Sequence, residues 1–167
     1  FGLAILLIFK YSGSTEEGVF LAGVFLATFL IFIYDFRFLI IPDVLVAAGL
    51  IWVLAAKFWF FRGNIKNDFL TGLAIFIFFF LMHRFSKGKW VGGGDAKLGF
   101  LLGLWLGWPL GFLGLFAAYI TGAVVGIGLI LFKKVTFKSQ IPFGPFLITG
   151  AWLAYIWGYR ILELYGI

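Results

Sequence analysis

The sequence has no cysteine and only one histidine among its 167 residues. These shortages exclude a disulfide framework, a thiol nucleophile and any metal site built from several cysteines or histidines. Charged residues are also scarce: they make up 12% of the chain, about half of the roughly 25% that is usual in soluble domains. Seven residues are acidic, so a carboxylate that lies within apolar sequence calls for a functional explanation.

Apolar residues dominate what is present. The chain is 63% hydrophobic and 22% aromatic. A soluble domain of this size buries only about 70% of its surface, so it could not hide this much apolar area from water. The composition excludes a soluble globular domain, a disordered segment and a nucleic-acid-binding module. It predicts an all-α polytopic membrane protein whose surroundings are a lipid bilayer, and the net charge of +6 then becomes a signal of topology.

Long apolar runs predict six transmembrane helices. Residues 18–41, 44–61 and 69–82 supply three of them. Residues 98–132 carry no charge, and one helix of that length would measure about 52 Å, far more than the ~30 Å hydrocarbon core. This run is therefore expected to turn back at residues 107–109, Gly-Trp-Pro, and to form two spans. Residues 141–159 form the last span.

The start of the chain is interpreted separately. Residues 1–9 are apolar but too short to cross a membrane, so we expect them to be the tail of a truncated span. Residues 1–167 as a whole are expected to form a single transmembrane domain.

The basic residues predict the orientation, because cytoplasmic loops carry an excess of lysine and arginine. One face holds eight of them: Arg37, Arg84, Lys87, Lys89, Lys97, Lys133, Lys134 and Lys138. The other holds Lys10, Arg62, Lys66 and Arg160. The first face is therefore expected to be cytoplasmic. Lys57 lies within a span and is expected to extend its ammonium group outward to the membrane surface.

Two of the seven acidic residues stand out. Asp35 lies within apolar sequence near the cytoplasmic end of its span, and Asp95 follows three glycines at the cytoplasmic start of another. Both carboxylates are thus expected at a similar depth in the membrane, near its cytoplasmic face. Two carboxylates in one site cannot both ionise easily, so they share a proton, as in aspartic proteases. One then takes a proton from water while the other donates to the substrate carbonyl, although paired carboxylates also occur in proton and cation pathways.

The order of three motifs resembles that of a known family. Residues 35–43 read D-F-R-F-L-I-I-P-D, residues 92–97 read G-G-G-D-A-K, and residues 141–147 read I-P-F-G-P-F-L. Together they resemble the type IV prepilin peptidases, which are membrane aspartic proteases with a G-x-G-D motif. The G-x-G-D motif alone would be a weak signal in a glycine-rich chain, but the three elements in this order are specific and span nearly the whole chain.

This resemblance implies a function and a site. Asp35 and Asp95 would be the catalytic aspartates, with no metal and no cofactor. The substrate would be a prepilin or pseudopilin, whose basic leader is cut after a glycine at the cytoplasmic face of the inner membrane. Family likeness and helix-breaking residues also indicate further residues that contact the substrate or line the cleft: Gly92, Gly93, Gly94, Lys97, Pro42, Pro142 and Gly144. Members of the family also methylate the new N-terminus through an N-terminal domain; the short loops here predict cleavage without methylation.

Two other interpretations remain open. Tyr34-Asp35 with G-x-G-D is also typical of the signal-peptide-peptidase and presenilin class, but the chain has no later P-A-L motif, and the 35-to-95 interval is short for that class. A small transporter could instead use the two aspartates as proton or cation relays, although internal repeats would then be expected.

The remaining polar residues are given structural roles. Asp43 is expected to cap a helix, and His83 to be structural at the end of a span. Four acidic residues are expected to be solvated charges: Glu16, Glu17, Asp68 and Glu163.

Overall fold

The computed structural model of the chain describes residues 8, 12–59, 64–132, 141–164 and 166. Six α-helices and no strand occur in these residues, so the prediction of an all-α protein is confirmed. The helices are α2 (Thr15–Phe38), α3 (Asp43–Trp59), α4 (Ile65–Ser86), α5 (Gly93–Leu106), α6 (Leu110–Leu131) and α7 (Gly144–Leu164). The truncated first span and the loop at 133–140 lie outside the described residues.

Local capping interactions explain where α2 begins and ends. The hydroxyl of Ser14 accepts a hydrogen bond from the backbone of Glu17 at 3.1 Å, which satisfies one of the free N–H groups of the first turn. At the other end Leu39 adopts a left-handed conformation, with φ of 55°, and donates its N–H to the carbonyl of Asp35. The helix therefore ends at Phe38, three residues after Asp35, and Asp35 lies in its last turn.

The predicted corner in the long apolar run is confirmed. Helix α5 ends at Leu106 and α6 begins at Leu110, so residues 107–109 make the turn. Gly107 has a φ of 68°, and a Cβ there would collide with the side chain of Asp68. Both the backbone conformation and the lack of space therefore require glycine at this corner.

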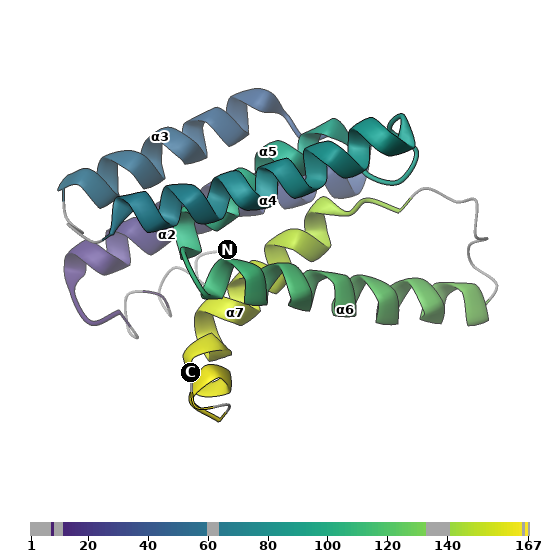
Figure 1. Cartoon of the computed structure of the whole chain (residues 1–167). Coiled ribbons are helices and arrows are strands. Elements are labelled where there is room, and N and C mark those ends of the chain that lie inside the picture. The colour runs from purple at the N-terminus through teal and green to yellow at the C-terminus, as the bar shows by residue number, and fades with distance from the viewer. Residues whose placement is uncertain (1–7, 9–11, 60–63, 133–140, 165, 167) are drawn as a thin grey trace.

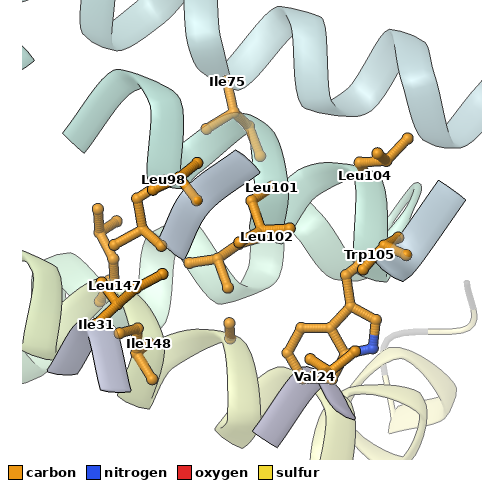
Figure 2. Packing of buried hydrophobic residues seen from close by; sticks show 14 of the residues in the cluster. Val24, Ile31, Ile75, Leu98, Leu101, Leu102, Leu104, Trp105, Leu147 and Ile148 are labelled. Carbon is orange, nitrogen blue, oxygen red and sulfur yellow. The ribbon is translucent and has the colours of Figure 1, made fainter. Parts of the chain in front are cut away.

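Helix α5 is the centre of the fold. It packs against α3, α4, α6 and α7, while α2 closes the bundle by packing against α3 and α7 (Figure 1). Figure 2 shows the core that results. Leu98, Leu101, Leu102, Leu104 and Trp105 of α5 meet side chains from α2, α4 and α7. Burial on all sides is why the central helix shows apolar residues around its whole circumference.

Membrane crossing is supported for three of the described helices. Helices α2, α4 and α6 are long and apolar enough to span a bilayer. Helix α5 has 14 residues. At 1.5 Å per residue it is about 21 Å long, shorter than the ~30 Å hydrocarbon core. The prediction of membrane-spanning helices thus holds for α2, α4 and α6.

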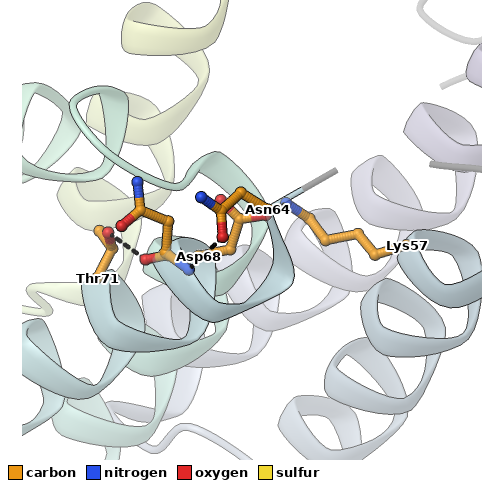
Figure 3. Close-up of polar contacts among 5 residues, drawn as sticks. Lys57, Asn64, Asp68 and Thr71 are labelled. Carbon is orange, nitrogen blue, oxygen red and sulfur yellow. Dashed lines mark hydrogen bonds and ion pairs between the residues drawn. The ribbon is translucent and has the colours of Figure 1, made fainter. Parts of the chain in front are cut away.

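Two expectations about charged residues were wrong. Lys57 does not extend its ammonium group outward; it forms an ion pair with Asp68, and both side chains are mostly buried, with 12% and 18% of their area exposed. Asp68 is therefore no solvated charge. Figure 3 shows Lys57 reaching from α3 toward the first turn of α4, where Asn64 and Asp68 lie. Glu17 is also engaged, since it accepts a hydrogen bond from the Tyr155 hydroxyl at 3.1 Å.

Candidate active site

Asp35 is buried in the last turn of α2, with 5% of its area exposed. Its Oδ2 accepts a hydrogen bond from the backbone N–H of Gly144 at 3.0 Å. Gly144 is the first residue of α7, where the N–H groups have no partner within the helix. A free helix N-terminus thus holds the Asp35 carboxylate, with the positive end of the helix dipole facing it.

Asp95 is buried to the same degree in the first turn of α5, with 6% of its area exposed. Its Oδ2 accepts a hydrogen bond from the backbone N–H of Gly92 at 2.9 Å. In this bond a carboxylate of the first helical turn accepts from the backbone N–H of the N-cap residue. Asp95 therefore caps its own helix and at the same time is held in a fixed orientation.

The fold brings the two aspartates into one site. The last turn of α2 and the first turn of α5 place the two carboxyl groups near enough to interact electrostatically. Ile41 links their surroundings. A Cβ added at Gly94 would meet the Ile41 side chain at 2.8 Å, and one at Gly144 would meet it at 3.4 Å. The backbones next to Asp95 and opposite Asp35 thus pack on the same side chain.

The three glycines before Asp95 have separate consequences. Gly92 and Gly93 are exposed, whereas Asp95 itself is buried. A Cβ at Gly92 would lie 3.2 Å from Oδ2 of Asp95. Gly94 instead allows the close contact with Ile41. Gly94 thus lets the start of α5 pack closely against the segment between α2 and α3.

Lys97 is not placed at the carboxylate of Asp95. Residues two apart on a helix point to roughly opposite sides, and Lys97 pairs with Asp43 of α3 at 2.7 Å. Both side chains are largely exposed, and they lie at one end of an apolar groove of about 490 Å³ between α3, α4 and α5. Pro42 directly precedes Asp43, and its carbonyl accepts the first hydrogen bonds of α3. Of the residues we expected in the cleft, Lys97 thus lies at this groove, and Pro42 directly precedes one of the helices that line it.

The segment that contains Pro142 leads directly into the site. Phe143, between Pro142 and Gly144, packs against Phe79 of α4 and Tyr119 of α6, with ring centroids 6.0 and 5.3 Å apart. These contacts fix the segment just before the Gly144 N–H reaches Asp35. Tyr119 also interacts electrostatically with Asp95, so its ring belongs to the surroundings of the site.

His83 is the residue that the sequence analysis missed. Its Nδ1 lies 2.9 Å from the carbonyl oxygen of Val91, in the loop that precedes Asp95, and it interacts electrostatically with that aspartate. Sequence signals for this role were limited to its being the sole histidine, directly after the apolar run of residues 69–82. Within the described part of the chain, no group of three or more carboxylates and histidines could hold a metal ion.

Comparison with known proteins identifies the family. The sequence profile described as the type IV leader peptidase family matches residues 21–127, which include both Asp35 and Asp95. The chain belongs to the type IV leader peptidase family. Membership does not favour the presenilin-like or transporter interpretations. The matched segment ends before α7, so Gly144 lies outside it.

Several curated relatives are named "Prepilin leader peptidase/N-methyltransferase". The relative from Pseudomonas aeruginosa is 32% identical over 75% of this chain and 45% of its own length. The one from Legionella pneumophila is 31% identical over 99% of the chain and 55% of its own length. The one from Bacillus subtilis is 28% identical over 88% and 59%. The chain thus spans about half the length of the curated relatives it matches, and no solved structure matches it.

Proposed function

We propose that this chain is a membrane-embedded aspartic endopeptidase that removes the basic leader of prepilins and pseudopilins. The observation that carries the proposal is the pair of buried carboxylates, Asp35 of α2 and Asp95 of α5, each oriented by one backbone N–H. A buried pair of this kind is suited to share one proton between them. Family membership and the names of the relatives supply the substrate class.

The proposed chemistry uses the Oδ1 atoms of the two carboxyl groups. Each backbone N–H binds Oδ2, which leaves Oδ1 of each group for water and substrate. The ionised carboxylate takes a proton from water as the water oxygen adds to the scissile carbonyl carbon. The protonated one gives its proton to the carbonyl oxygen. When the tetrahedral intermediate collapses, the carbon–nitrogen bond breaks and the leaving amine takes up the proton that came from water.

The place of the site suggests where the substrate is cut. Asp35 is at the end of α2 and Asp95 at the start of α5, next to the lysines of residues 87–97. By the distribution of basic residues this face is cytoplasmic. We propose that the inner membrane holds the chain and that α3, α5 and α7 cross together with α2, α4 and α6. The leader would then be cut after its glycine at the cytoplasmic surface, while the apolar helix of the substrate stays in the bilayer.

The test uses the purified chain in detergent with a prepilin-like peptide, followed by mass analysis of the products. A single cut after the glycine is expected, and a peptide with that glycine replaced by a bulky residue should stay intact. The matched control is a preparation of Asp35→Asn and Asp95→Asn together. Proton flux into liposomes without any cleavage would contradict the proposal and support a transporter.

A further inference from the structure

The loop between α4 and α5 contains a peptide group with a hydrogen bond at each end. The carbonyl oxygen of Val91 lies 2.9 Å from Nδ1 of His83, and the N–H of Gly92 lies 2.9 Å from Oδ2 of Asp95. Val91 contributes the carbonyl and Gly92 the N–H of the same peptide bond. A carbonyl oxygen only accepts, so Nδ1 of His83 must carry the proton.

We propose that His83 is a positioning residue that orients the Asp95 carboxylate through the peptide group of Val91 and Gly92. The inference rests on the proposed function, because it concerns the orientation of a catalytic group. A peptide group is planar and rigid, so a bond that fixes its carbonyl also fixes the direction of its N–H. Hydrogen bonds at both ends polarise the group and strengthen each other. His83 thereby makes Gly92 a stronger and better aimed donor to Asp95.

The loop is built around the imidazole ring. A Cβ added at Gly88 would lie 3.2 Å from Cε1 of His83, and one at Gly93 would lie 3.7 Å from it. Lys87 and Gly88 both have positive φ, at 52° and 76°, so the chain turns sharply over the ring. His83 itself belongs to the last turn of α4, which anchors the ring in a helix. Helix α4 thus fixes the position of the His83 ring, and the ring in turn fixes the loop through its hydrogen bond to Val91.

The first test does not depend on catalysis. Because the chain has one histidine, selective ¹⁵N labelling of histidine gives ring signals that belong to His83 alone. In the neutral ring we expect the proton on Nδ1, since only that form donates to Val91. A neutral ring protonated on Nε2 would overturn the proposal, whether or not the chain cleaves prepilins. A chain with the expected tautomer but no cleavage would contradict the proposed function alone.

The second test separates positioning from folding. In His83→Asn the side-chain amide nitrogen takes the place of Nδ1 and still donates, whereas His83→Leu fills the space without a donor. Loss of one such hydrogen bond corresponds to about a tenfold effect, and we expect His83→Leu to lower kcat by that factor with KM nearly unchanged. His83→Asn should keep most of kcat. Equal losses in both variants, or no loss in His83→Leu, would overturn the proposal.

The matched control is Phe85→Leu, in the same turn of α4. Phe85 is 78% exposed. Its substitution should change neither kcat nor the tautomer of His83. Thermal unfolding of all three variants, measured in the same detergent, shows whether any loss of kcat follows from a loss of folded protein.

Discussion

The backbone N–H of Gly144 donates to Oδ2 of Asp35 at 3.0 Å, although 109 positions separate the two residues in the sequence. This bond ties the end of α2 to the start of α7. The space at Gly144 is as important as the donor, because a Cβ there would lie 2.5 Å from the same carboxylate oxygen. Gly144 thus fixes the position of Asp35 in two ways: its N–H binds the carboxylate, and its lack of a side chain leaves room for it.

Gly144→Ala is expected to lower the rate of cleavage by about 100-fold, because a displacement of about 1 Å in a catalytic group has an effect of that size. The added methyl group must push Asp35 away or shift the start of α7. The measurement is kcat for a prepilin-like peptide, with KM and thermal stability determined on the same preparations.

Gly128→Ala is the matched control. It makes the same chemical change inside α6, where a Cβ meets nothing within 4 Å. Alanine favours a helix more than glycine does, so this variant should be at least as stable as the parent chain and equally active. Equal activity of both variants would mean that the contact between Gly144 and Asp35 has no part in catalysis.

Asp35→Asn and Asp95→Asn should each abolish detectable cleavage while the protein still inserts and folds. An amide neither takes a proton from water nor donates one as an acid, and general acid–base groups contribute at least about 100-fold to a rate. Product formation is followed by mass analysis at equal amounts of folded protein.

Asp43→Asn provides the comparison. Asp43 pairs with Lys97 at an exposed site, and exposed ion pairs contribute little to stability. Its loss should leave most of the activity. An Asp43 variant as inactive as that of Asp35 would show that the first catalytic aspartate has been misassigned.

The sequence predicted the features that depend on local pattern. Long apolar runs placed the helices, and the Gly-Trp-Pro corner was expected because an uncharged run of that length does not fit across a bilayer. Asp35 was chosen because carboxylates are costly in apolar surroundings, and Asp95 because it follows three glycines at the start of another helix. Each of these signals is contained in a short stretch of sequence, so no knowledge of the packing was needed.

The features that depend on how consecutive helices and the loop between them pack were not predictable. Lys57 was expected at the membrane surface and Asp68 in water, yet they pair between the last turn of α3 and the first turn of α4. His83 was expected to be structural only, since nothing in the sequence shows that the following loop folds back over its ring. In both cases the partner is chosen by how two helix ends meet, which periodicity and composition do not encode.

The two ends of α4 should be reached from opposite sides of the membrane. The helix has 22 residues, which gives a length of about 33 Å, enough to cross the hydrocarbon core. Because the chain has no cysteine, Lys66→Cys and Lys89→Cys each introduce a single thiol. An impermeant maleimide should label Lys66→Cys in intact spheroplasts, but Lys89→Cys only after lysis. Labelling of both in intact spheroplasts would overturn the topology and the cytoplasmic site.

The ion pair of Lys57 and Asp68 should matter for stability rather than for catalysis. Both side chains are mostly buried, so Lys57→Met leaves the Asp68 carboxylate without its cation in a poorly solvated place. Removal of one partner from such a pair is expected to lower the free energy of unfolding by about 3 kcal/mol. Thermal unfolding in detergent measures the change.

Two further variants identify the cause. Lys57→Met combined with Asp68→Leu removes both charges, and it should regain part of the lost stability because no unpaired charge remains. Lys66→Met makes the same change at an exposed lysine in the first turn of α4, where Asp68 also lies. It should leave the free energy of unfolding nearly unchanged. The pair is 14 residues along α3 from Asp43, about 21 Å away from the face that carries the aspartates. Cleavage per folded molecule should therefore be unchanged in all three variants; a loss of kcat in folded Lys57→Met would mean that this pair also shapes the active site.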